Sequence, residues 1–197
     1  MENKSTVVLA SGGLDSTLIS VMCRDAGVDN FPLFIDYGQR AAVAELEACR
    51  RVYSELNLPS PTYMNLGGFG KVIESGLTSA EKDVRLDAFT PCRNLLFLVC
   101  GASFAFQKNA YSISIGVLSE EFSLFPDQRQ NFLVAAEAAI RSALGRSIPV
   151  IAPLSEFSKA DVVALARDRS IFGTYSCHAG GRLPCGNCIS CLEFVNT

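Results

Sequence analysis

Apolar runs alternate with segments of helical periodicity along the first part of the chain. Residues 6–10 and 31–36 are short, nearly continuous apolar runs, which are typical of strands buried on both faces of a parallel sheet. Each run is followed by a segment whose apolar residues recur with a helical period, and these segments end at Gly27 and before Pro59. The pattern predicts two consecutive strand–helix units of an α/β fold.

The alternation continues after a less regular stretch at residues 67–88, which predicts a loop with a short helix. The other expected elements are helices at 15–26, 41–56, 93–107, 129–144 and 159–169, and strands at 111–118 and 149–153. The helix at 93–107 is almost wholly apolar, so it must pack on the sheet or on a partner subunit. We therefore expect a doubly wound, mainly parallel sheet with helices on both faces in residues 1–174, with residues 175–197 as a small tail packed on it.

The sequence Ser-Gly-Gly-Leu-Asp-Ser-Thr follows directly after the first predicted strand. Its two glycines permit close approach to a ligand, its hydroxyls can donate hydrogen bonds, and the next helix points its positive end into the same space. The pattern predicts a phosphate-binding loop formed by Ala10, Ser11, Gly12, Gly13, Leu14, Asp15, Ser16 and Thr17. The alternative is a tight strand-to-helix turn in which Asp15 or Ser16 is the N-cap.

Charge and length exclude several classes of function. The 197 residues carry a net charge of −3, which argues against strong, non-specific binding of nucleic acid. No apolar run is long enough to span a membrane, and the first residues lack the features of a signal peptide. Four of the eight cysteines gather near the end of the chain, a pattern that favours a metal site in a reducing compartment. We expect a cytoplasmic protein.

The gathered cysteines are Cys177, Cys185, Cys188 and Cys191. Their short spacings form tight turns whose thiolates converge on one point, as a tetrahedral Zn²⁺ requires, and four protein sulfurs leave no open position for water. A [4Fe–4S] cluster and unliganded thiols are the alternatives. The sole histidine, His178, could replace a cysteine at the metal, but a position beside the metal or at the surface is favoured.

The string at residues 11–17 resembles the SGGxDS motif of the PP-loop, or ATP-pyrophosphatase, proteins, whose fold is HUP-like. Further stretches occur in the same order as in the QueC family, the 7-cyano-7-deazaguanine synthases. They are Asp36-Tyr37-Gly38-Gln39-Arg40, Pro91-Cys92-Arg93-Asn94, Phe125-Pro126-Asp127, Ser158-Lys159-Ala160-Asp161 and the cysteine tail. The sequence is identified as a divergent member of this family on their combined order.

The resemblance implies an ATP-dependent carbon–nitrogen ligase of queuosine biosynthesis. Such an enzyme adenylates the carboxylate of 7-carboxy-7-deazaguanine, and ammonia then displaces AMP to give the amide and finally the nitrile. It implies ATP, Mg²⁺ and Zn²⁺ as cofactors and a homodimer as the assembly. Asp15, Ser16, Arg93 and Lys159 are then expected to be catalytic, with Asp36 and Lys159 also binding the nucleotide.

Some stretches depart from the family pattern. The histidine that usually follows Gln39-Arg40 is Ala41, and Gln128 stands where many members have a cysteine. These changes leave the identity of the amine acceptor and of the product open. The reaction could stop at the amide, or the acid could be coupled to an amine on a protein. Modification of tRNA, as in other PP-loop proteins, and a zinc-ribbon binding module are the remaining alternatives.

Overall fold

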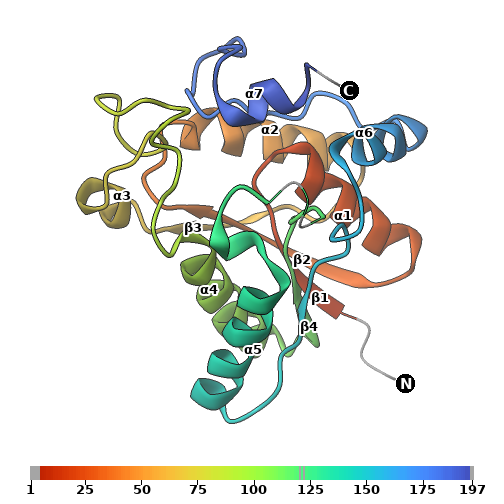
Figure 1. Ribbon diagram of the computed structural model, residues 1–197. Coiled ribbons are helices and arrows are strands. Elements are labelled where there is room, and N and C mark those ends of the chain that lie inside the picture. The colour runs from red at the N-terminus through yellow and green to blue at the C-terminus, as the bar shows by residue number, and fades with distance from the viewer. Residues whose placement is uncertain (1–4, 120, 122, 196–197) are drawn as a thin grey trace.

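The computed structural model describes residues 5–119, 121 and 123–195. Five parallel strands form one sheet in the order β3-β2-β1-β4-β5 (Figure 1). The strands are β1 (Ser5–Leu9), β2 (Asp29–Asp36), β3 (Thr62–Asn65), β4 (Ser112–Ser114) and β5 (Val150–Ile151). The order reverses between β1 and β4, so the predicted doubly wound parallel sheet is confirmed.

Helices cover both faces of the sheet. They are α1 (Leu14–Asp25), α2 (Ala42–Glu55), α3 (Gly68–Val72), α4 (Arg93–Lys108), α5 (Gln130–Leu144), α6 (Lys159–Asp168) and α7 (Ile189–Glu193), with a 3₁₀ turn η2 (Pro126–Gln128). Figure 1 shows α4 and α5 together on one side of the sheet, with α1, α2 and α6 on the other. Among the described residues, no helix is both long and apolar enough to span a bilayer.

Two hydrophobic clusters form the core, one on each face, and β1 contributes to both. Val7 and Leu9 pack with residues of α4 and α5, whereas Val8 and Ala10 pack with residues of α1, α2 and α6. Alternate side chains of a strand point to opposite faces, so a nearly continuous apolar run is what a central strand of a three-layer fold needs. The apolar run at the start of the chain is therefore consistent with the central position of β1 in the sheet.

The edges of the sheet differ most from the pattern-based expectation. The strand expected at residues 111–118 is regular only over β4, and the one at 149–153 only over β5. β3 was not expected at all, because it is an edge strand whose residues are largely exposed and give no apolar run. The short helix expected within 67–88 is α3, while α7 within the cysteine tail was not foreseen.

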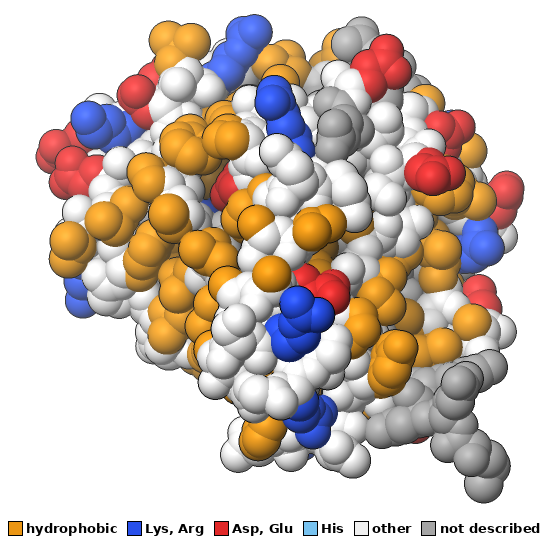
Figure 2. All heavy atoms as spheres, turned by 60° about the horizontal axis from the view of Figure 1, so that its bottom comes forward, with side chains coloured by type: hydrophobic (Ala, Val, Ile, Leu, Met, Phe, Trp, Pro, Cys, Tyr) orange, Lys and Arg blue, Asp and Glu red, His pale blue; other side chains and the backbone are white. Residues whose placement is uncertain are grey.

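The nearly apolar α4 packs on the sheet, but part of its outer side is exposed. Leu98 and Ala105 are buried, whereas Val99 and Phe106 are about half exposed. On the face that Figure 2 shows, apolar side chains lie in several groups between charged and polar ones. Packing on the sheet therefore accounts for one side of the helix, and the expected homodimer stays a prediction.

Candidate functional site

A cleft opens at the carboxyl ends of β1, β2 and β4, where the strand order reverses. Ligands of open α/β sheets bind at such a switch point. The cleft is lined from four directions: the loop after β1, the first turns of α4 and α6, and the cysteine tail. Of the residues expected to be catalytic or to bind the nucleotide, Ala10, Ser11, Gly13, Leu14, Asp15, Ser16, Arg93 and Lys159 line it. Widely separated segments therefore meet at one site.

The glycine loop is closed by its own hydroxyls. The Ser11 amide donates to Oγ of Ser16 at 3.1 Å, and the hydroxyl of Thr17 donates to the Gly13 carbonyl at 2.8 Å. Gly12 has a φ of +78°, and a Cβ there would run into the backbone carbonyl of Glu45. Only glycine fits this position without strain. Gly12 and the buried Thr17 thus stabilise the conformation of the loop but do not line the cleft.

The start of α1 leaves its first amides without a side-chain cap. Gly13 is the N-cap, and Asp15 and Ser16 lie inside the helix, so the alternative in which either of them caps the turn is wrong. Uncapped amides and the positive end of the helix dipole together favour an anion at this point. The loop therefore offers free helix amides to an anion, and its binding of phosphate stays a prediction.

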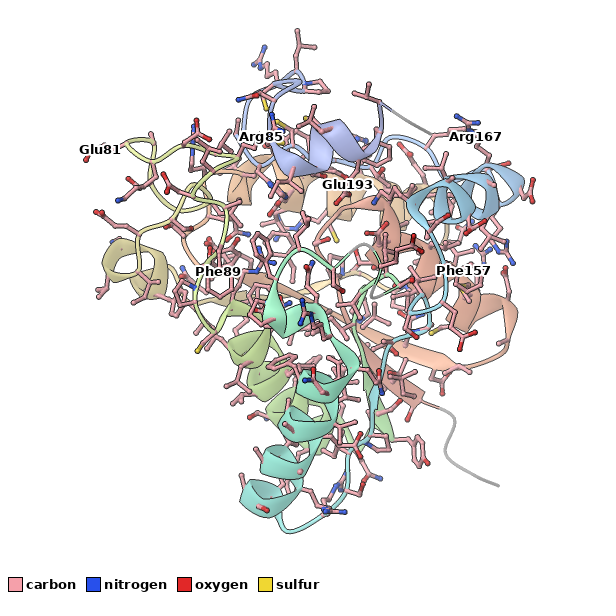
Figure 3. All side chains as sticks on the ribbon, in the orientation of Figure 1. Glu81, Arg85, Phe89, Phe157, Arg167 and Glu193 are labelled. Carbon is pink, nitrogen blue, oxygen red and sulfur yellow. The ribbon has the colours of Figure 1, made fainter. Side chains whose placement is uncertain are left out.

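Lys159, the first residue of α6, brings a cation to the loop. Its Nζ lies 2.8 Å from Oδ1 of Asp15 and 3.4 Å from Oε2 of Glu193 on α7. The ammonium group also lies 4.8 Å from the ring centre of Phe194. Burial raises the pKa of Glu193, and the Lys159 charge opposes that rise. Glu193, labelled in Figure 3 at the short helix α7, lines the cleft and was not identified from the sequence.

Arg93 forms the opposite wall. It begins α4, and its guanidinium carbon lies 5.9 Å from the ring centre of Phe97. The next residue, Asn94, donates two hydrogen bonds to Asp127. Its backbone amide donates to Oδ2 at 3.3 Å, and its side-chain Nδ2 donates to the backbone carbonyl at 2.9 Å. The Pro-Asp stretch at 126–127 therefore fixes the start of α4 and with it the position of Arg93.

Glu45, in the first turn of α2, is a further cleft residue that the sequence analysis missed. Its Oε2 accepts a hydrogen bond from Nε2 of Gln39 at 2.9 Å. Burial raises the pKa of Glu45 to about 7, an effect opposed by the Gln39 hydrogen bond and by the charge of Arg93. A glutamate in an Ala-Glu-Leu-Glu stretch has the pattern of an exposed helix residue, so no local signal marked it.

Asp36 does not reach this cleft. Its Oδ1 accepts from the Gly38 amide at 2.9 Å, and its Oδ2 accepts from the Tyr63 hydroxyl at 2.7 Å. The carboxylate borders a neighbouring hollow together with Gly38 and Lys71. The position of Asp36 at the end of β2 suggested that it lines the main cleft, but its bonds to Gly38 and Tyr63 direct the carboxylate toward the neighbouring hollow.

The four cysteines of the tail converge. Their sulfur atoms all lie within 4.8 Å of one another, and Cys185 Sγ lies 4.0 Å from Cys191 Sγ. The amides of Cys185, Cys188 and Cys191 each donate to a sulfur of the cluster at 3.3–3.4 Å. Such amide bonds stabilise thiolates. The group of residues suited to a metal is formed by these cysteines without His178.

The tail also shapes the cleft. The Tyr175 amide donates to the Gly12 carbonyl at 2.9 Å, so the tail is bound directly to the glycine loop. His178 lines the cleft, and its Nδ1 is buried without a hydrogen-bond partner among the described residues. Burial lowers the pKa of His178 to about 4. The cysteine cluster thus holds one wall of the site in place.

Residues 5–194 match the family described as queuosine biosynthesis protein QueC. The chain belongs to the QueC family. It is 31% identical to the 7-cyano-7-deazaguanine synthase of Sulfurimonas denitrificans, with 100% of this chain and 93% of the relative covered. It is 36% identical to that of a Synechococcus species, with 96% and 91% covered.

Solved structures that resemble this QueC-family chain share its fold but little of its sequence. The U34-tRNA thiolase NcsA of Methanococcus maripaludis, with its [4Fe–4S] cluster, superimposes with a TM-score of 0.57 at 13% identity. That match covers 93% of this chain and 63% of the thiolase. A 4-thiouridine synthetase in complex with RNA and ATP also gives 0.57, at 20% identity, covering 98% of this chain and 50% of the synthetase.

Proposed function

We propose that this chain adenylates the carboxylate of 7-carboxy-7-deazaguanine with ATP and transfers ammonia to the activated carbon. The amide would form first, and a second activation of its oxygen would give 7-cyano-7-deazaguanine. The observation that carries the proposal is the meeting of an uncapped glycine loop with Lys159 in a chain of the QueC family. A phosphate chain and an acid can both be recognised in the same cleft.

The cationic side chains suggest how charge is managed during activation. The phosphates of ATP would bind the amides at the start of α1 and draw Lys159 from its carboxylate partners. Arg93 on the opposite wall would hold the carboxylate of the acid or the phosphate of the acyl-adenylate. Asp15 and Ser16 line the cleft at the loop, and in this proposal they would contact the phosphates and Mg²⁺. Mg²⁺, when bound, neutralises the departing pyrophosphate.

For the cysteine cluster we propose Zn²⁺ with a structural role. Tetrahedral ligands at the usual zinc–sulfur distance stand about 3.8 Å apart. The sulfurs here lie within 4.8 Å of one another, which suits a single ion. Each thiolate of a [4Fe–4S] cluster binds a different iron atom, so the sulfurs must stand further apart. The ion would hold the segment that carries Tyr175, His178 and Glu193.

The nitrogen nucleophile that attacks the acyl-adenylate is the least constrained part of the proposal. Ammonia is the expected nitrogen donor. An amine on a protein is the alternative, because Ala41 and Gln128 depart from the family pattern and Gln128 lines the cleft. The net charge of −3 disfavours a tRNA acceptor. A separate zinc-ribbon module is disfavoured by the contact between Tyr175 and the glycine loop. We place the enzyme in the cytoplasm, where its thiols stay reduced.

The test is an ATP-to-AMP assay with the acid and ammonia, followed by mass spectrometry of the product. AMP formation should depend on the acid, and the mass should identify nitrile, amide or adduct. Asp15→Ala should abolish turnover while remaining folded, whereas Asp168→Asn at the exposed end of α6 should leave it unchanged. Absence of acid-dependent AMP in the wild type would refute the proposal.

A further inference from the structure

The proposed reaction, on which this inference rests, must remove protons from nitrogen at two points. When ammonia adds to the acyl-adenylate, its nitrogen becomes positively charged and loses one proton as AMP departs. When the amide oxygen has been adenylated in turn, both remaining N–H protons leave as AMP departs again and the C≡N bond forms. Each step needs an acceptor close to the nitrogen that is unprotonated near neutral pH.

Among the described residues, three carboxylates line the cleft: Asp15, Glu45 and Glu193. Asp15 and Glu193 both contact the ammonium group of Lys159, at 2.8 and 3.4 Å. A carboxylate in such a pair loses the pair when it takes up a proton, which makes it a poor acceptor. Glu45 differs, because its hydrogen-bond partner is the neutral amide of Gln39 and the described ion pairs do not include it.

The Glu45 carboxylate is held in a fixed position. Gln39 donates to its Oε2 at 2.9 Å, and Gln39 is itself oriented by the Tyr37 amide, which donates to Oε1 of Gln39 at 2.9 Å. The backbone carbonyl of Glu45 abuts Gly12, so the residue stands directly behind the glycine loop. The side chain is partly buried and faces the cleft. Its carboxylate therefore lines the cleft beside the glycine loop, which would hold the phosphates of ATP.

We propose that the Glu45 carboxylate is the catalytic base that takes the protons from the reacting nitrogen. One N–H bond breaks and one O–H bond forms on Glu45 as each proton leaves, and the proton then passes to solvent through the open cleft. Gln39 acts as a positioning residue for this carboxylate. The electrons of the broken N–H bonds remain on nitrogen, where they form the C–N multiple bond as AMP is expelled.

The electrostatic surroundings agree with this role. Burial raises the pKa of Glu45 to about 7, and the carboxylate of Asp36 adds to the rise, while Gln39 and Arg93 oppose it. Tyr37 and Tyr175 also interact electrostatically with Glu45, and burial raises the pKa of each tyrosine. A base whose pKa lies near the working pH combines a sufficient ionised fraction with useful basicity.

Glu45→Gln separates this role from the alternatives, with Glu47→Gln on the exposed side of α2 as the matched control. Two rates are measured: the exchange of pyrophosphate into ATP that depends on 7-carboxy-7-deazaguanine, which needs only adenylation, and formation of the amide and nitrile. In Glu45→Gln, product formation should fall about 10²- to 10⁴-fold while exchange stays within about threefold of wild type. Retained exchange also shows that the variant is folded.

The pH profile gives a second readout. In the wild type at saturating ammonia, log kcat should rise up to about pH 7 and then level off, and Glu45→Gln should lose this rise. The inference is overturned if the variant forms product at the wild-type rate, or if exchange and product formation fall together, which would make Glu45 a binding or structural residue. A wild type without exchange would instead refute the proposed function itself.

Discussion

The ammonium nitrogen of Lys159 lies 2.8 Å from Oδ1 of Asp15, although the two residues are 144 positions apart in the chain. The contact joins the first turns of α1 and α6 across the mouth of the glycine loop. Glu193 approaches the same ammonium from the cysteine tail at 3.4 Å. Three separate segments thus meet around one cation at the point where phosphates are expected to bind.

Glu193→Gln should tighten ATP binding by about two- to fivefold, as measured by calorimetry. The substitution removes a negative charge near the phosphates and releases Lys159 from one of its two carboxylates, and a partly exposed pair of this kind is worth up to about 1 kcal/mol. Glu156→Gln, an exposed change, serves as the control. Weaker ATP binding in Glu193→Gln would show that this carboxylate assists the nucleotide rather than competing with it.

Gly12→Ala should abolish ATP binding and destabilise the protein by about 1–3 kcal/mol in urea unfolding. The residue has a φ of +78°, and the added methyl group would meet the Glu45 carbonyl. Gly27→Ala is a matched control, because its φ of +66° is similar but no atom lies within 4 Å of the new methyl group. Equal effects of the two substitutions would assign the cost to backbone strain alone.

The sequence predicted the centre of the fold better than its edges. The buried runs of β1 and β2 have a continuous apolar pattern because helices cover both of their faces, whereas β3 and β5 are edge strands with little such signal. The loop at 11–17 could be located because glycines and hydroxyls follow directly after a strand. Tertiary packing decides the rest.

Side-chain direction was the least predictable property of the site. Asp36 follows β2 as expected, yet its carboxylate is turned away by bonds to Gly38 and Tyr63. Glu45 and Glu193 have the pattern of ordinary helix glutamates and enter the cleft only because α2 and α7 pack against the glycine loop and α6. Contacts between distant segments leave no trace in local periodicity.

Cys185→Ser should remove one equivalent of bound zinc, measured by elemental analysis, and lower the melting temperature by about 5–10 °C. The sulfur is one of four within 4.8 Å, and loss of the ion would loosen the segment that contacts the glycine loop. Cys92→Ser, an exposed cysteine outside the cluster, should keep both the metal and the melting temperature. Iron in place of zinc in the wild type would contradict the proposed ion.

Glu45→Gln should gain stability relative to wild type as the pH rises. The pKa of Glu45 is raised from 4.5 to about 7 in the folded state, so folding favours the protonated carboxyl group. The free energy of unfolding of the wild type is therefore highest below pH 4.5, and this stabilisation is lost as the pH rises through 7. The difference in unfolding free energy between variant and wild type should therefore grow between pH 5 and pH 8, by up to about 3 kcal/mol. Urea titrations at several pH values measure it, and a constant difference would contradict the raised pKa.

Attack of the substrate carboxylate on the α-phosphorus of ATP can be followed directly with ¹⁸O. The acid, labelled with ¹⁸O in its carboxylate, is incubated with the enzyme, ATP and ammonia, and the nucleotide product is analysed by mass spectrometry. The proposed adenylation yields AMP that carries one ¹⁸O atom transferred from the acid. Unlabelled AMP, or ADP as the product, would contradict it.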